Sequence, residues 1–295
     1  MSVSSKQAPA AAQRPGLMRR IVSTPAVSIS GGFLLLLLLI ALLAPLLAPY
    51  DPYAQDLSRR LLPPIGYPNH DAAHLLGTDG FGRDYLSRLV YGTRISLLIG
   101  FSVVFIAGLI GTTIGMIAGY FGGKVDQVLM FVINTRLAMP VFLAAMAVVV
   151  VFGASLTSTV LTLGLFLWDR FAVVVRSATQ QVAAQDFVLA AQSIGFSNTR
   201  IIFKEILPNI LSVVVVIATL EMGSAILLEA ALSFLGFGVQ EPTASWGLML
   251  SQAREQLFFD AWLIYLPGFA LLSLVLAINV FGDGLRDLLG ARGRA

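Results

Sequence analysis

Long uncharged stretches are the feature of this sequence that most restricts its fold. Residues 21–50, 95–123, 137–168 and 261–282 contain no Asp, Glu, Lys, Arg or His. A helix crosses a bilayer with about 20 mostly apolar residues, and in lipid its backbone amides must all be bonded internally. These four stretches therefore predict membrane-spanning helices and not the core of a soluble domain.

The uncharged stretches and one further segment predict six spans. The stretch 137–168 is too long for one helix, and Phe152-Gly-Ala-Ser155 breaks it, which gives spans at about 127–151 and 157–176. Another span runs from Leu207 to about Leu235, although it contains two glutamates. We therefore predict an all-α integral membrane protein with six helices.

Composition excludes several other classes of protein. Only 12% of the 295 residues are charged, about half of the usual share in a soluble domain, so a soluble enzyme and a disordered tail are both excluded. The chain has no cysteine, which removes disulfides, thiolate nucleophiles and Cys-ligated metals. No cluster of Lys and Arg is interleaved with aromatic residues, so we expect no nucleic-acid partner.

The distribution of Lys and Arg predicts the topology. The first apolar stretch is longer than the core of a signal peptide, so we expect a retained helix. Residues 1–26 carry four basic residues and no acid, which favours a cytoplasmic N-terminus. We divide the chain into a cytoplasmic tail (1–26), a first span with a periplasmic loop (27–94), a five-helix core (95–283) that contains a cytoplasmic loop (184–209), and a second cytoplasmic tail (284–295).

The outer loop ends in a predicted amphipathic helix. Asp79 is a suitable N-cap, and Phe81, Tyr85 and Leu89 follow on one helical face. We expect this helix to lie at the membrane surface before the second span.

Glycines repeat every fourth residue in the second span, at Gly111, Gly115 and Gly119. On a helix these positions form one stripe of small residues, so a neighbouring backbone can approach closely. The partner is a helix of the same chain or of another chain, and we favour packing within the chain.

Charged residues inside spans are costly and suggest function. Glu221 and Glu229 lie in the fifth span, and Arg136 and the Asp169-Arg170 pair lie in the third and fourth. We favour pairing between helices. The alternative is an ion- or proton-coupled secondary transporter that uses Glu221 and Glu229 as its sites.

Two motifs resemble chemical sites but do not meet their requirements. His70 and His74 have the spacing of a zinc helix, but Asp71 stands where a metalloprotease needs Glu and the chain has no third histidine. An intramembrane metalloprotease is therefore a third hypothesis, and we expect no metal. The glycines around Lys124 lack both the spacing of a phosphate loop and the Ser or Thr after its Lys, so we expect no nucleotide or other cofactor in this chain.

A polar segment between the fourth and fifth spans has the form of a docking helix. Phe187, Ala190, Ala191 and Ile194 fall at helical spacing and predict one apolar face, and Gly195 is a natural residue to end the helix. The following segment passes through Leu207-Pro208 into the fifth span. The alternative to docking is a helix that lies on lipid.

This segment resembles the coupling loop of ABC importer permeases. Ala190, Ala191, Gly195, Leu207 and Pro208 match that pattern in register, whereas Leu189 replaces its Glu and Glu205 stands where peptide permeases often have His. Further blocks resemble the second, C-type permease subunit of dipeptide, oligopeptide and nickel importers: residues 74–88, 119–123, 233–240, 245–249 and 282–287. The family usually has Asp where Asn134 stands, and Glu229 matches a commonly acidic position.

The resemblance implies a six-helix type I ABC importer transmembrane domain that performs no chemistry itself. It implies a homologous second permease, two cytoplasmic ATPase subunits that carry ATP and Mg, and an external binding protein, all at a bacterial inner membrane. Import by alternating access is the implied function and peptides are the implied substrates, with dipeptides, longer peptides and nickel chelates left open.

Overall fold

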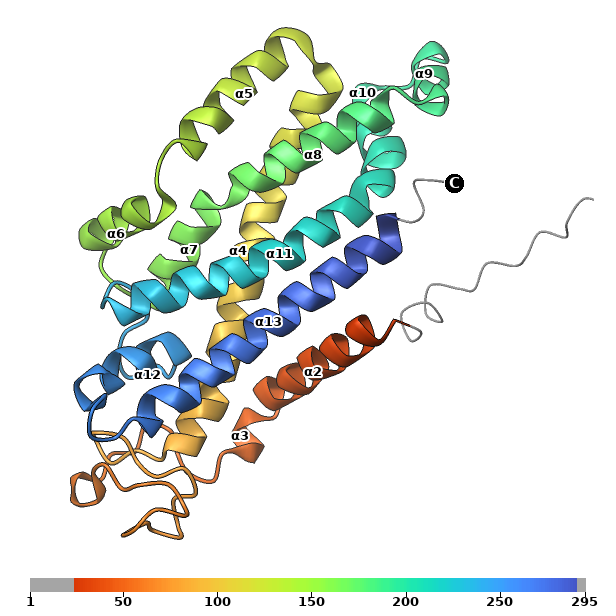
Figure 1. The fold of residues 1–295 in the computed structure, drawn as a ribbon. Helices are drawn as coiled ribbons and strands as arrows, with labels where there is room; N and C mark the ends of the chain where they lie inside the picture. The colour runs from red at the N-terminus through yellow and green to blue at the C-terminus, as the bar shows by residue number, and fades with distance from the viewer. Residues whose placement is uncertain (1–23, 291–295) are drawn as a thin grey trace, which may run out of the picture.

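The computed structural model describes residues 24–290, and this part of the chain is helical with no strand (Figure 1). Predictions for residues 1–23 and 291–295 lie outside it. The α-helices are α2 (Pro25–Leu42), α3 (Ala44–Leu47), α4 (Tyr85–Phe121), α5 (Gly123–Leu137), α6 (Val141–Phe152), α7 (Leu156–Phe166), α8 (Trp168–Ala183), α9 (Asp186–Ser193), α10 (Asn198–Arg200), α11 (Leu207–Phe234), α12 (Trp246–Ala253) and α13 (Trp262–Gly290). Three short irregular helices are η1 (Leu57–Arg59), η2 (Ile201–Ile206) and η3 (Arg254–Gln256).

Five helical segments of the described chain are long and apolar enough to cross a membrane, and a sixth is added if the bent pair α5–α6 is one span. The prediction of six spans is met in this way. The segment that we expected as a span at about 127–151 is not one straight helix, because α5 and α6 meet at 80°. Pro140 explains the break, since proline lacks an N–H and forces the preceding residue out of the helical conformation.

The second span is the 37-residue helix α4. Its N-cap is Asp84, whose Oδ2 accepts a hydrogen bond from the Ser87 backbone N–H at 2.8 Å. The predicted surface helix that begins at Asp79 is therefore wrong. Asp79 lies in a turn, where its Oδ1 accepts hydrogen bonds from the backbone N–H groups of Phe81 and Arg83, and the residues from Tyr85 onward are already the first turns of the span.

The helices alternate between two ends of the bundle (Figure 1). The start of α2, the end of α13 and α9 lie at one end, which we call the α9 end. The loop between α3 and α4 and the short helix α12 lie at the other end, which we call the loop end. Segments that the charge distribution predicts on the same side of the membrane therefore lie at the same end of the bundle.

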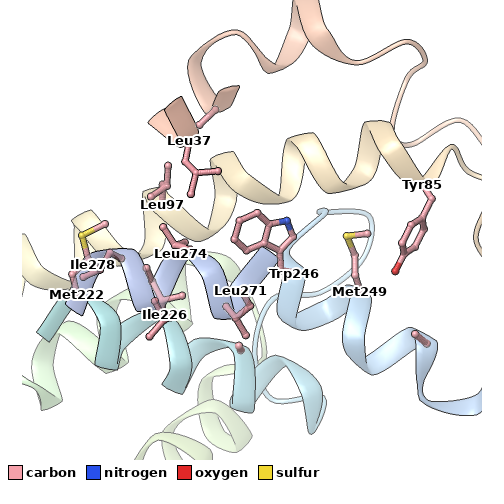
Figure 2. Close-up of a cluster of buried hydrophobic side chains, with 14 of the residues drawn as sticks. Leu37, Tyr85, Leu97, Met222, Ile226, Trp246, Met249, Leu271, Leu274 and Ile278 are labelled. Carbon is pink, nitrogen blue, oxygen red and sulfur yellow. The ribbon is translucent and has the colours of Figure 1, made fainter. Parts of the chain in front are cut away.

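One apolar cluster joins α2, α4, α11, α12 and α13 near the loop end. Figure 2 shows Trp246 of α12 among Leu97, Ile226 and Leu271 of neighbouring helices. The Trp246 indole Nε1 donates a hydrogen bond to the Leu89 carbonyl at 3.0 Å, so the ring is held by apolar contact and by one polar bond. This cluster fixes the short helix α12 to the membrane bundle.

The glycine stripe packs α4 against α8. An added Cβ at Gly111, Gly115 or Gly119 would stand 2.2, 2.6 or 2.6 Å from a backbone oxygen of α8. Those distances are far below any real carbon–oxygen contact, so only glycine permits this separation of the two helices. The stripe therefore serves packing within the chain, as we favoured.

Candidate coupling loop and intramembrane charges

The predicted docking segment forms a separate short helix at the α9 end. Gly195 follows the last turn of α9, and its φ of +85° is the left-handed conformation that glycine adopts without strain. The Phe196 N–H donates to the Ala191 carbonyl at 3.1 Å, which closes the helix, and the Ser197 hydroxyl oxygen caps the next turn by accepting from Arg200 N–H. The expected helix stop at Gly195 is present, and Ser197 begins the next helix.

The four residues expected on one face of α9 are divided by the structure. Phe187 and Ile194 are 43% and 72% exposed and Ala190 is also exposed, whereas Ala191 is only 6% exposed. Phe187 and Ala191 share a side of α9 because they are four residues apart, but Ala191 stands at the edge of that side and is buried against the bundle. The spacing of Val188 and Ala191, three residues apart, was the signal for that inner face.

A separate apolar cluster anchors α9 to the bundle. Val188 and Ala191 pack with Ile201 and Ile206 of η2, with Val175 of α8, and with Met116 of α4 in the same cluster. Leu207 is partly buried at its edge, and Pro208 is exposed at the first turn of α11, where a missing N–H costs nothing. Force applied to α9 therefore acts on three spans through packed side chains.

The intramembrane charges pair across helices. Glu221 of α11 accepts a hydrogen bond from the Arg170 guanidinium of α8 at 3.2 Å. Arg136 of α5 lies 3.9 Å from Asp169, donates to the Phe166 carbonyl and stacks its guanidinium 4.5 Å from the Phe166 ring centre. Arg136 thus joins α5 to the break between α7 and α8.

Of the two remaining predicted site residues in the spans, one is buried and the other is exposed. Glu229 is fully buried, and its Oε1 accepts hydrogen bonds from the Ser233 hydroxyl at 2.7 Å and the Ser245 hydroxyl at 3.3 Å. It therefore joins α11 to the N-cap of α12. Asn134 is exposed on α5, away from that contact.

The two histidines make separate contacts. His70 is exposed, and its Nδ1 lies 2.9 Å from the Tyr67 carbonyl, whereas His74 is buried with its Nδ1 2.9 Å from Asp84 Oδ1. Within residues 24–290, no three His, Cys, Asp or Glu side chains form a group that could hold a metal ion. His74 instead orients the carboxylate that caps α4.

A charged network at the loop end was missed by the sequence reasoning. Arg83 is 1% exposed and donates to Asp79 Oδ2 at 2.7 Å and to Glu241 Oε2 at 2.5 Å, and the fully buried Arg88 lies 3.4 Å from the same Asp79 oxygen. Gln252 of α12 also donates to Glu241. The residues 83 and 241 are 158 positions apart, so no local pattern could join them.

The pKa of Glu241 follows from this network. Partial burial alone would raise the pKa of the carboxyl, but the hydrogen bonds and charge of Arg83 outweigh it and lower the pKa below its usual value. Glu241 is therefore ionised in ordinary buffers, and the network ties the α3–α4 loop to the segment before α12.

Comparison with known proteins identifies the class. Residues 111–294 match the family of the binding-protein-dependent transport system inner membrane component, and residues 17–64 match the N-terminal transmembrane domain of oligopeptide transport permease C. The chain belongs to this family of transport permeases. The fold of the inward-facing MetNI methionine ABC transporter agrees, with a TM-score of 0.57 at 19% identity over 68% of this chain and 96% of that chain.

The curated relatives are permease subunits of peptide transport systems. The dipeptide transport system permease protein DppC of Haemophilus influenzae is 41% identical over 87% of both chains. The di/tripeptide permease DppC of Pseudomonas aeruginosa is 42% identical over 88% of this chain and 86% of its own length. The expected family, the type I ABC importer fold and the role as a transport permease are confirmed, and the secondary-transporter and metalloprotease hypotheses are not favoured.

Proposed function

We infer that this chain is one of two permease subunits of an ATP-driven importer for di- and oligopeptides. The observation that carries the substrate class is the naming of its relatives as dipeptide, di/tripeptide and oligopeptide permeases at 40–42% identity over three quarters or more of this chain. A homologous permease completes the pathway, two ATPase subunits carry ATP and Mg, and an external binding protein delivers the solute. This chain itself needs no cofactor and catalyses no reaction.

The anchoring of α9 supports a role as the mechanical contact with the ATPases. Phe187, Ala190 and Ile194 form an exposed apolar face on a helix that hangs below the spans, and such side chains gain most by docking into a partner. Ala191 and Val188 connect that helix to the bundle. ATP-driven closure of the ATPases would move α9, and Gly195, Leu207 and Pro208 carry the motion into α11. The bundle then alternates between inward-facing and outward-facing states.

The charge distribution supports the orientation of the chain. The α9 end, where α2 begins and α13 ends, is cytoplasmic, because the sequence of residues 1–26 is basic without any acid. The loop end then faces the periplasm of a bacterial inner membrane, where the binding protein docks.

The test of coupling uses exposed residues, because a change at the buried Ala191 would disturb the fold of the loop. We expect Ile194→Asp and Phe187→Asp to leave the chain folded in the membrane, since both side chains are exposed. In the complete transporter in proteoliposomes, uptake and the ATPase stimulation by loaded binding protein should fall at least about tenfold, because docking would bury a charge. Gln192→Asp is the matched control, since it adds the same charge to the same helix at an exposed polar position.

Two results would contradict the proposal. If Ile194→Asp kept the stimulated ATPase activity of Gln192→Asp, α9 would not be the docking element. If this chain alone accumulated dipeptides in response to an ion gradient without any ATPase, the importer mechanism itself would be wrong.

A further inference from the structure

Helix α8 exposes a charged side chain midway along a span, where other spans of the described chain expose large apolar side chains. Leu35 of α2, Phe105 of α4 and Phe269 of α13 are 57%, 72% and 71% exposed, as expected of surfaces that face lipid. On α8, Arg170 is exposed, with 52% of its side chain accessible. It stands at the middle of the 28-residue span Leu156–Ala183.

The exposed side of α8 carries Arg170, Ser177 and Gln181, with Val174 between the first two, and we call it the polar stripe. Ser177 and Gln181 are exposed, and their spacing from Arg170 places all three on one side of the helix. A charge at the centre of the bilayer costs several kcal/mol against hydrocarbon and is found facing protein or water-filled cavities. This face of α8 therefore does not lie against lipid.

Glu221 holds Arg170 in place without covering it. The carboxylate of Glu221 is buried and accepts one hydrogen bond from the Arg170 Nη1 at 3.2 Å. A guanidinium carries five N–H donors in a planar fork, so the remaining donors on the exposed side suit a carboxylate. The buried acid thus fixes the position of a cation whose outer edge is free to bind.

A cavity of about 380 Å³ adjoins this pair between α8, α11 and α13. Its wall includes Val174, one turn after Arg170, and Leu220, the neighbour of Glu221, together with Val213 and Val216. Ser212 and the cationic Arg286 also line the cavity, so its wall is mostly apolar with a second cation in it, and the Arg170–Glu221 pair lies beside it. A mostly apolar wall with a few oriented charges is typical of sites for small organic ions, and both cations near this cavity favour an anionic group.

We propose that Arg170, held by Glu221, lines the aqueous pathway and contacts the carboxylate of the solute in transit, such as the C-terminal carboxylate of a peptide. This inference rests on the proposed function and makes Arg170 a specificity residue of the pathway. The polar stripe of α8 is then the wall along which the solute leaves toward the α9 end.

The absence of cysteine from this chain permits a direct test. Val174→Cys is introduced into the complete nucleotide-free transporter. Its thiol is reacted with two membrane-impermeant thiosulfonate reagents, one that carries an anionic sulfonate group and one that carries a cationic ammonium group. The rate of each reaction is measured from the intact mass of this chain. We expect Val174→Cys to react, and the anionic reagent to be favoured. Leu35→Cys, on the lipid-facing side of α2, should react with neither and serves as the control.

The charge of Arg170 is tested in the Val174→Cys background. Arg170→Gln should lower the ratio of anionic to cationic reaction rates about tenfold, and Arg170→Lys should restore most of it, because the local potential depends on the cation. A dipeptide should protect the introduced thiol better than the same dipeptide as its C-terminal amide, and Arg170→Gln should remove that difference. If Arg170→Gln alone misfolds, the double variant Arg170→Gln/Glu221→Gln removes both charges and is measured instead.

The outcomes separate this inference from the proposed function. The inference would be overturned if Val174→Cys reacted with neither reagent in any state. It would also be overturned if Arg170→Gln left the ratio of anionic to cationic reaction rates unchanged. Equal protection by the dipeptide and its amide would overturn the carboxylate contact. In each of these cases ATP-driven dipeptide uptake would still proceed in proteoliposomes, whereas its absence from the unmodified transporter would instead reject the proposed function.

Discussion

The close approach of α4 and α8 makes a sharp prediction for two neighbouring glycines. A Cβ added at Gly111 would stand 2.2 Å from the Trp168 carbonyl oxygen and 2.5 Å from the Phe171 Cβ. One turn earlier on the same helix, a Cβ at Gly108 would meet only the Phe171 ring, at 3.4 Å. Gly111→Ala therefore forces the two backbones apart by about 1 Å, whereas Gly108→Ala fits.

The comparison isolates the cost of that separation. Both substitutions gain the same helix propensity, about 0.5–1 kcal/mol, so it cancels in the difference. Overpacking then leaves Gly111→Ala less stable than Gly108→Ala by about 1–3 kcal/mol, which corresponds to a factor of about 5–150 in the unfolding equilibrium. A gap of about 1 Å also removes up to about half of the dispersion energy along the seam.

Equilibrium unfolding in mixed micelles of a mild detergent and dodecyl sulfate, followed by tryptophan fluorescence, measures this difference. Gly32→Ala is a second control, because nothing lies within 4 Å of its added Cβ in helix α2. If Gly111→Ala and Gly108→Ala unfolded at the same detergent composition, the two helices would not be in backbone contact, and the assignment of the glycine stripe would be refuted.

Two further predictions concern the two ends of the molecule. The lowered pKa of Glu241 means that its ionised form stabilises the fold above its unfolded pKa of about 4.3 and that this contribution is lost as pH falls through the lower folded value. The difference in Tm between the unmodified chain and Glu241→Gln should therefore be full at about pH 6–7 and shrink progressively as the pH falls below about 4.3, and a constant difference would contradict the network. Gly195→Ala should strain the left-handed turn by about 1–2 kcal/mol without a clash, and Gly195→Asn should cost less. Substrate-stimulated ATPase activity should therefore be highest in the unmodified transporter, lower in Gly195→Asn and lowest in Gly195→Ala. Equal activities in all three would show that the turn is unimportant for coupling.

The spans could be predicted because lipid imposes a simple rule on sequence. Absence of charge over about 20 residues is visible without any knowledge of contacts, and the structure follows those stretches closely. The bend at Pro140 follows from a sequence signal as well, since proline ends a helix, although only the break at Gly153 was predicted. The start of α4 was misplaced because Asp79 and Asp84 are both good N-caps, and only the tertiary contacts of Asp79 decide between them.

The pairing of charges could be predicted only in part. Each of Glu221, Arg136 and Arg170 was identified as an expensive charge in a span, but the partners depend on how helices far apart in the chain are rotated against one another. The inward side of Ala191 has the same origin, because a short amphipathic helix does not reveal which of its faces meets its own bundle. Long-range packing, and not local propensity, decides these features.

The length of α4 has a mechanical consequence. Arg88 in its first turn belongs to the charged network at the loop end, and Met116 near its last turn belongs to the cluster that holds α9. The helix contains no proline, so these two residues are joined by an unbroken rod of about 42 Å at about 1.5 Å per residue. A rod of this kind cannot tilt at one end alone. The charged network at the loop end and the cluster that holds α9 are thus connected by one straight helix of the same chain.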